Sequence, residues 1–522
     1  MSWEEVLDSF AREFVERRAR REGFDYTRHS FYVHDPMTQF LSVLFTGFIG
    51  RTSYYYMRAE EVFALSLRLH ALASMKDPDF YVDALRAARG LPAIKDQVML
   101  GALNLSKHAM RTKYRDDLVA LLSSFPPNQI VKKYINTKRK HSAIVGGGLG
   151  SFEKAVLRAV WETWPEWKQE YYAAKYRRYV KDMIRVAHIP ASSDLWSYLV
   201  RPTAYSGQSP YLSKVSRWLK TKSEDIAFDH PKLPFNLYRS NVPFSEWTTW
   251  ALANTDLTGN TVVLQAKSLY TRFGDDFLPY LGRAARSPTV TADKILKAAI
   301  ACFDIGPLAR ELARQYAVKA AETYKQVLLP VEMPNLAVVL DASGSMEPIK
   351  LQGPFGKALS VVAPLAPLVR RLIMFSEKAR DEDPRLLSSF EGLERLLEIA
   401  MNDYNSSTNI ADGLALALDA VKSREVNAVV LVTDEQANVL RGAVKEMDIM
   451  REIMDEGAAM IVVNPTPYPV HIADIRDKRI VYVPAPNPES FAAALRLVQV
   501  ERYARERGAK ALVEALAKAK PF

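Results

Sequence analysis

Oxygen-bearing side chains occupy alternate positions in one short segment of the sequence. Asp341, Ser343 and Ser345 follow directly after the apolar run at residues 336–340. A turn that carries a carboxylate and two hydroxyls so close together can offer all three to one hard cation. Residues of these types also cap helices, and capping is the simpler interpretation of any one of them.

Two later segments carry the same chemistry. Thr408 lies just before a helical pattern, and Asp434 comes just after the apolar run Ala428–Val432. If the apolar runs are neighbouring parallel strands, their carboxyl ends meet at one edge of a sheet. Capping alone does not explain three such loops in this order. The sequence therefore predicts an oxygen-only site for a divalent cation, best suited to Mg²⁺. Its predicted ligands are Asp341, Ser343, Ser345, Thr408 and Asp434.

The elements around these loops follow a regular alternation after residue 332. Short apolar runs occur at residues 336–340, 372–375, 428–432, 460–463 and 480–483. Helical patterns separate them at residues 356–371, 388–401, 411–422, 444–456 and 490–500. Buried strands that alternate with helices predict a doubly wound, Rossmann-like parallel sheet.

Most of the chain before this region shows apolar residues at helical spacing, with Gly and Pro at the breaks. The predicted helices cover residues 60–74, 80–89, 97–107, 115–124, 152–164, 167–178 and 180–188. Many short helices in series predict a helical repeat domain with extended surfaces. Residues 222–242 are polar and contain prolines, which favours a long loop. Residues 500–522 have the composition of a basic helix.

The charge of the chain is unevenly distributed. The 522 residues have a net charge of +10, but residues 331–522 hold 23 basic and 27 acidic residues, a net charge of −4. Residues 1–330 therefore carry +14, which indicates an acidic partner such as nucleic acid. A single cysteine, Cys302, excludes an intrachain disulfide and fits a reducing, cytoplasmic compartment. No apolar run approaches the roughly 18 residues of a membrane span.

Basic residues concentrate between residues 132 and 188, where tyrosines interleave with them. Cations can neutralise RNA phosphates, and tyrosines beside them can stack on unpaired bases. The alternative is a solvated helical surface over a tyrosine core. The predicted RNA-binding residues are Lys132, Lys133, Lys138, Arg139, Lys140, His141, Lys154, Arg158, Lys175, Arg178, Lys181, Arg185 and His188.

The Asp-x-Ser-x-Ser segment, the later Thr408 and the strand-end Asp434 resemble a known pattern. It is the metal-ion-dependent adhesion site of the von Willebrand factor A domain, and the resemblance covers residues 333–500. In that family the metal keeps an open position that a partner's carboxylate can fill, and the domains usually bind rather than catalyse. One departure is Asn409, which stands where the family often has Asp.

Three segments of the helical region resemble the TROVE domain of the Ro autoantigen family. They are residues 47–56 (GFIGRTSYYY), 148–164 (GLGSFEKAVLRAVWETW) and 181–190 (KDMIRVAHIP). They occur in the order in which the family has them, although residues 181–190 have one residue fewer before the proline. A TROVE-like region followed by an A domain is the Ro architecture.

The resemblance implies a multidomain α plus α/β protein: a TROVE ring of HEAT-like helical repeats over residues 1–330, an A domain over residues 331–500, and a basic C-terminal helix over residues 501–522. It also implies a protein without enzymatic activity that binds small noncoding Y-type RNAs. Misfolded or structured RNAs with single-stranded 3′ ends, and an exoribonuclease, are further implied partners. The alternative is a metal-dependent protein–protein adaptor, or a partner of a chaperone-type ATPase, that acts through its A domain.

Overall fold

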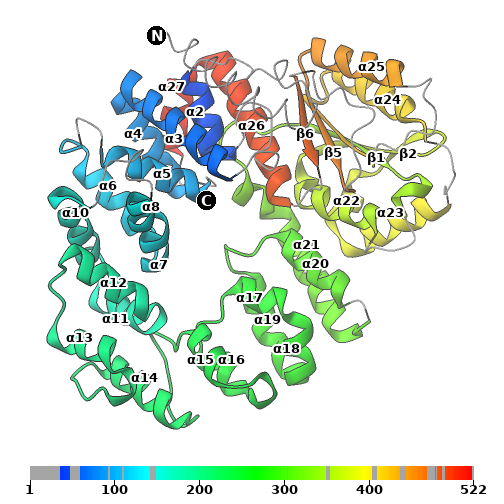
Figure 1. Ribbon diagram of the computed structural model, residues 1–522. Coiled ribbons are helices and arrows are strands. Elements are labelled where there is room, and N and C mark those ends of the chain that lie inside the picture. The colour runs from blue at the N-terminus through cyan, green and yellow to red at the C-terminus, as the bar shows by residue number, and fades with distance from the viewer. Residues whose placement is uncertain are drawn as a thin grey trace. The chain divides into compact units, whose positions relative to one another are not determined.

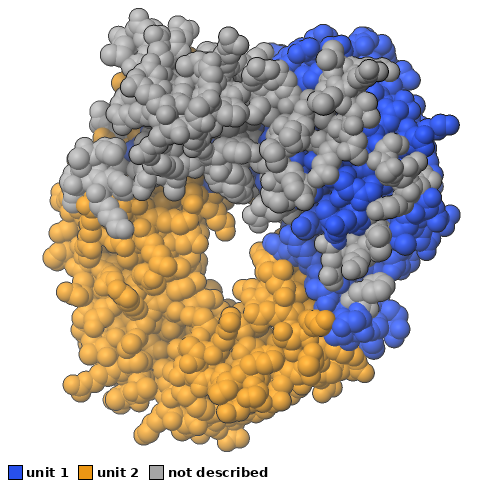
Figure 2. Space-filling model, turned by 45° about the vertical axis from the view of Figure 1, so that its right-hand side comes forward, with its two compact units in different colours: residues 1–73, 91–94, 291–522 blue, residues 74–90, 95–290 orange. Residues whose placement is uncertain are grey.

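The computed structural model describes residues 36–47, 59–91, 94–107, 111–140, 149–302, 304–347, 353–402, 408–434, 443–466, 477, 479–484 and 488–519. Contacts divide the chain into two compact units, which Figure 2 shows in different colours. Unit 1 comprises residues 1–73, 91–94 and 291–522, and unit 2 comprises residues 74–90 and 95–290.

Unit 1 contains a six-stranded sheet with the order β3-β2-β1-β4-β5-β6 (Figure 1). Every neighbouring pair is parallel except β2 with β3. The strands are β1 (Leu336–Asp341), β2 (Val369–Phe375), β3 (Ala379–Glu382), β4 (Ala428–Val432), β5 (Ala459–Asn464) and β6 (Ile480–Pro484). All five apolar runs are strands, as predicted. The sequence did not predict β3, because this short edge strand is charged and lacks an apolar face.

Helices cover both faces of the sheet, which confirms the predicted doubly wound A-type fold. Helices α24 (Ile410–Lys422) and α25 (Ala443–Asp455) pack on the face that includes Ala337 and Val339. Helix α22 (Pro354–Val362) contacts β1, and helix α26 (Pro488–Arg507) contacts β5 and β6. The predicted helix at residues 356–371 was wrong at its end, because a proline-containing 3₁₀ segment follows α22 and β2 begins at Val369.

Unit 1 also contains further helices. They are α2 (Pro36–Thr46), α3 (Ala59–Lys76, which continues into unit 2), α20 (Ala292–Ala301), α21 (Gly306–Val327), α23 (Phe390–Asn402) and α27 (Ala509–Lys518). Helix α2 packs along α26. The basic tail continues the fold, because α26 runs on to Arg507 and α27 buries Leu512, Val513 and Leu516 while it contacts α26 and α2.

The regular elements in the described residues of unit 2 are helices, apart from one isolated β-bridge. Its α-helices are α4 (Pro78–Gly90), α5 (Lys95–Leu105), α6 (Arg115–Ser123), α7 (Pro127–Gln129), α8 (Asn136–Lys140), α10 (Ser151–Glu162), α11 (Glu166–Lys175), α12 (Arg177–Ala187), α13 (Ser193–Val200), α14 (Pro210–Thr221), α15 (Phe235–Asn241), α16 (Thr249–Asn254), α17 (Gly259–Leu264), α18 (Ala266–Phe273) and α19 (Leu278–Ala285). A π-helix, Ile130–Ile135, connects α7 to α8.

Two predictions for unit 2 need correction. The predicted helix at residues 167–178 ends at Lys175, because Tyr176 leaves the helical conformation (φ −127°) before α12 begins. Residues 222–242 are not entirely a loop, because α15 starts after Pro234, whose fixed φ suits the entry to a helix. The helical repeat character of the region is otherwise confirmed.

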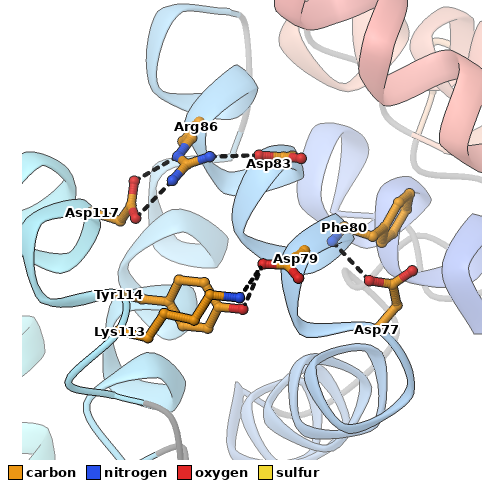
Figure 3. Close-up of polar contacts among 8 residues, drawn as sticks. All are labelled: Asp77, Asp79, Phe80, Asp83, Arg86, Lys113, Tyr114 and Asp117. Carbon is orange, nitrogen blue, oxygen red and sulfur yellow. Dashed lines mark hydrogen bonds and ion pairs between the residues drawn. The ribbon is translucent and has the colours of Figure 1, made fainter.

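Surface ion pairs connect α4 to α6 and the segment before it (Figure 3). Asp79 accepts hydrogen bonds from the Lys113 ammonium (2.7 Å) and the Tyr114 hydroxyl (2.8 Å), and Arg86 forms two hydrogen bonds to Asp117 (2.6 and 2.9 Å). Exposed pairs of this kind stabilise a fold by only about 0–1 kcal/mol each. They matter here because they neutralise Arg86 and Lys113.

Some sequence features fall outside the described residues. Of residues 47–56 only Gly47 is described, and residues 1–30 are not described. Among the helices that the structure does describe, none is long and apolar enough to cross a membrane.

Candidate functional site

The end of β1 presents the first predicted metal ligands. Asp341 is the last residue of the strand and is fully buried. One oxygen of its carboxylate accepts a hydrogen bond from the backbone N–H of Ser343 (2.8 Å), and the other accepts from the Thr433 hydroxyl (2.6 Å). The hydroxyls of Ser343 and Ser345 lie 3.1 Å apart. The loop after β1 therefore brings three predicted ligands together.

Thr408 and Asp434 lie at the same edge of the sheet. Because Leu340 is in register with Val432, Asp341 at the end of β1 and Asp434 just after β4 lie at the same end of two paired strands. Hydrogen bonds connect the end of β2 to the loop after β1 and to the loop that contains Thr408. The Ala342 N–H donates to the Phe375 carbonyl (2.8 Å), and the N–H of Asn409, next to Thr408, donates to the Ser376 carbonyl (2.7 Å). All five predicted ligands thus gather at the carboxyl ends of β1, β2 and β4.

This edge lies at the point where the strand order reverses. The chain moves from β1 to β2 on one side, and β4 pairs with β1 on the other. Open parallel sheets bind ligands at such a point. The sequence reasoning missed Thr433, although a hydroxyl residue directly after a strand that pairs with β1 was a usable signal.

Burial raises the pKa of Asp341 to about 6. Hydrogen bonds from Ser343 and Thr433 act in the opposite direction, and the nearby charge of Asp434, which is also fully buried, raises it further. A second buried carboxylate close by disfavours ionisation of Asp341, and a bound cation would relieve that cost.

The donor set fits Mg²⁺, which accepts one or two carboxylates together with hydroxyls and water. Within the described residues no cluster of three or more His, Cys, Asp or Glu side chains could hold a metal ion. A site at this edge therefore depends on hydroxyls. Asn409 uses its side chain to cap α24, since its oxygen accepts a hydrogen bond from the Asp412 N–H (3.3 Å).

The predicted RNA-binding residues of unit 2 divide into two groups, and the first is neutralised by carboxylates. Lys133 pairs with Asp96, Lys138 with Glu153, and Lys175 with Asp256. A cation that is already paired releases fewer counterions when it meets a phosphate, so these residues are weaker candidates than the sequence indicated.

Lys138 needs the clearest correction. Its side chain is 1% exposed, and its ammonium lies 2.6 Å from a Glu153 carboxylate oxygen and above the Tyr134 ring (5.4 Å). A buried, paired ammonium cannot reach an RNA phosphate on the surface, so Lys138 has a structural role in this fold. Of its predicted neighbours, Lys140 is the last residue of α8 and His141 lies outside the described residues.

Lys175 also supports the fold. Its ammonium contacts the Tyr171 hydroxyl (2.6 Å) and Asp256, which in turn accepts a hydrogen bond from the Phe235 N–H. The arrangement connects α11 to the segment that carries α15. Burial raises the pKa of Tyr171 and, to about 12, that of Tyr172. These two interleaved tyrosines therefore belong mainly to the packing of unit 2.

The second group of predicted RNA-binding residues has no ion-pair partner among the described carboxylates. Its members lie on the π-helix, α8, α10 and α12: Lys132, Arg139, Lys154, Arg158, Arg178, Lys181 and Arg185. The structure also brings two predicted residues together, because Lys154 Nζ lies 3.3 Å from Nε2 of His188. His188 adopts a left-handed conformation (φ 53°) that ends α12.

Comparison with known proteins identifies the class of fold. No family model and no curated protein matches this sequence. Among solved structures, the crystal structure of the Deinococcus radiodurans Ro (RSR) protein matches with a TM-score of 0.56 and 17% sequence identity. The match covers 88% of this chain and 99% of that chain. The protein thus combines a helical repeat region with a Rossmann-like A domain. This is the fold of a Ro protein, which confirms the predicted resemblance at the level of the fold.

Proposed function

We propose that this protein is a Ro-like RNA-binding protein that binds small noncoding RNAs and misfolded or structured RNAs in the cytoplasm. In this proposal it acts as a ribonucleoprotein scaffold or in RNA quality control, by binding rather than by catalysis. The observation that carries the proposal is a set of cations in unit 2 without carboxylate partners among the described residues. The Ro-like fold supports it.

Several of these cations lie on α10 and α12, two helices that contact each other. Lys154 lies in the first turn of α10 and contacts His188 at the end of α12, so the start of α10 lies beside the end of α12. Arg158, one turn further along α10, and Arg185, one turn back along α12, are both exposed. We call Lys154, Arg158, Arg185 and His188 the α10–α12 band. Three cations without carboxylate partners in the described part of the chain, with an imidazole beside them, suit a phosphate backbone.

The experiment is a gel shift across salt concentrations with a structured RNA that has a single-stranded 3′ tail. The variant Lys154→Gln/Arg158→Gln/Arg185→Gln removes three charges of the band. The matched control Arg86→Gln/Lys113→Gln/Lys133→Gln removes three charges that are already paired. Each lost phosphate contact lowers the salt slope by roughly 0.7–0.9. We expect the band variant to lose on the order of 10–100-fold in affinity and the control to lose far less. Equal losses of RNA affinity in the two variants, or no RNA binding by the wild type, would contradict the proposal.

We propose that Asp341, Ser343, Ser345, Thr408 and Asp434 hold a divalent cation, Mg²⁺. When bound, the cation would neutralise the two buried carboxylates and offer an open coordination position. We expect Mg²⁺ to raise the melting temperature of the wild type and to leave that of Asp434→Asn unchanged. Asp412→Asn, on the exposed start of α24, is the matched control and should keep the shift.

A second candidate function is a metal-dependent protein–protein adaptor, or a partner of a chaperone-type ATPase. The two buried carboxylates at an edge of the sheet favour it, because a cation there could bind a partner's carboxylate. A chelator separates the two functions: RNA affinity that survives chelation belongs to unit 2, whereas an adaptor loses its partner. The exoribonuclease partner stays a prediction.

A further inference from the structure

A pocket of about 290 Å³ lies between the π-helix with α8 on one side and α12 on the other. Its polar lining consists of Lys132, Asn136, Arg139, Arg178, Tyr179 and Asp182, and three aliphatic side chains complete the wall. The whole pocket belongs to unit 2. This volume lies near the lower end of the roughly 300–1,000 Å³ of small-ligand sites, so it suits one nucleotide and not a duplex.

Local backbone geometry builds the two walls. On α12, Arg178 and Asp182 are four residues apart and therefore lie on one face. On the opposite side, Lys132 lies in the π-helix Ile130–Ile135. Segments of π-helix are rare and occur often at functional sites, because their wider turn redirects side chains. Lys132 on this π-helix and Arg139 near the end of α8 line the same pocket.

The pocket gathers three of the cations that lack carboxylate partners in the described part of the chain. Lys132, Arg139 and Arg178 have no ion-pair partner among the described carboxylates, although Asp182 lines the same pocket. Nearby cations such as Lys133 and Lys138 are paired. Lys132 Nζ lies 5.3 Å from the centre of the Tyr179 ring, so a cation–π contact forms part of the pocket wall. Three cations and one carboxylate leave an excess of positive charge.

We propose that this pocket binds a single unpaired nucleotide of the RNA, an inference that rests on the proposed function. Lys132, Arg139 and Arg178 hold its phosphate, and the base packs against Tyr179. Asp182 accepts hydrogen bonds from the edge of the base. Recognition of RNA sequence usually proceeds in this way, with unpaired bases that stack on aromatic rings and form hydrogen bonds at their edges.

The carboxylate makes the pocket selective. An ionised Asp182 can only accept hydrogen bonds, so it favours a base with adjacent donors. Guanine offers two neighbouring N–H groups, whereas the single N–H of uracil lies between two carbonyl oxygens that a carboxylate repels. We therefore expect a guanine nucleotide to bind best and a uracil nucleotide to bind worst.

The test is titration of the full-length protein with GMP, UMP and inorganic phosphate, followed by NMR or calorimetry. We expect GMP to bind at least several-fold more tightly than UMP, and inorganic phosphate to bind most weakly. Asp182→Asn should bring the GMP-to-UMP ratio close to one, and Arg178→Gln should weaken both nucleotides. Arg86→Gln, outside both the pocket and the α10–α12 band, should change neither, and thermal unfolding checks that each variant folds. No GMP binding at millimolar concentration, or phosphate binding as tight as that of GMP, would overturn the inference.

A parallel gel shift separates this inference from the proposed function. If RNA binds the wild type and Arg139→Gln/Arg178→Gln equally well, the pocket is not a nucleotide site but the proposed function stands. If the wild type binds no RNA, the proposed function fails, and the GMP titration still reports on the pocket. Loss of preference for an RNA with unpaired guanine over one with unpaired uracil, in Asp182→Asn alone, would support both.

Discussion

Lys138 and Arg139 are neighbours in α8 with opposite environments. The Lys138 ammonium is buried against Glu153, whereas Arg139 is exposed and lines the pocket beside α12. Removal of one partner of a buried ion pair leaves an uncompensated charge, which usually costs about 3–5 kcal/mol. An exposed side chain without a partner contributes little to stability, within about 0.5 kcal/mol.

The pair gives a prediction that separates stability from binding. We expect Lys138→Ala to lower the free energy of unfolding by about 3 kcal/mol, measured by urea denaturation. Arg139→Ala should leave that free energy within about 0.5 kcal/mol of the wild type but weaken RNA binding. The reverse pattern, with a stable Lys138→Ala protein that has lost RNA binding, would contradict the assignment.

The same ion pair makes stability depend on pH. Burial acts to raise the pKa of Glu153, but the hydrogen bond and charge of Lys138 outweigh it, so the pKa lies below its ordinary value of 4.5. A lowered pKa means that the unfolded chain binds more protons than the folded one near this pH. The stability contributed by ionised Glu153 is therefore complete above about pH 4.5 and is lost as the pH falls through the folded-state pKa.

We expect the free energy of unfolding of the wild type to fall more steeply below pH 4.5 than that of Lys138→Met/Glu153→Leu, which lacks the pair. Urea denaturation followed by circular dichroism between about pH 6 and pH 3.5 measures the difference. Superimposable pH profiles for the two proteins would show that the pair contributes nothing to acid sensitivity.

For single residues, the sequence was a better guide to which side chains could bind a ligand than to which of them are buried or ion-paired. The five residues proposed as metal ligands could be chosen because their order along the chain follows the strands. The burial of Lys138 could not, because Glu153 lies fifteen residues later and only the packing of α8 against α10 brings the two together. The pairing of Lys175 with Asp256 spans a still greater separation of 81 residues.

Among the elements, α26 does more than close one face of the sheet. Its Arg496 is buried, and the guanidinium donates hydrogen bonds to the carbonyl oxygens of Phe45 (2.8 Å) and Val327 (2.6 Å). These carbonyls lie at the C-terminal ends of α2 and α21, where a cation is favoured. One side chain thus connects three helices that are far apart in sequence.

We expect Arg496→Met to destabilise unit 1 by about 2–3 kcal/mol, because two buried carbonyls lose a charged donor. Arg502→Met is the matched control on the same helix. Arg502 makes only partly exposed ion pairs with Glu332 and Glu506, so its loss should cost less than about 1 kcal/mol. Chemical denaturation of both variants measures the loss of unfolding free energy. Equal losses in the two variants would contradict the role of Arg496 in connecting the helices.

Element boundaries followed the strength of the sequence signal. The predicted strand at residues 428–432 matches β4 at both ends, because five consecutive aliphatic residues are typical of a fully buried strand. The start of β2 was missed because Val369, Arg370 and Arg371 do not form an apolar run. The packing of helix α2 against helix α26 could not be predicted, because the two helices lie near opposite ends of the chain.

At the scale of the whole molecule, charge and fold agree on where an acidic partner should bind. Residues 331–522, which contain the sheet, carry a net charge of −4, and residues 1–330 carry +14. A phosphate backbone is repelled by the first and attracted by the second. The unpaired cations of α10 and α12 lie in the positively charged part. We therefore expect RNA affinity to fall steeply with salt and to be insensitive to chelation of divalent cations.

Ultraviolet crosslinking tests the central claim most directly. The full-length protein is crosslinked to a structured RNA with a single-stranded 3′ tail, digested, and analysed by mass spectrometry, with the Lys154→Gln/Arg158→Gln/Arg185→Gln variant in parallel. We expect most crosslinked peptides to come from residues 130–190, and their yield to fall in the variant. Crosslinks confined to residues 331–522, or unchanged yields in the variant, would contradict the account.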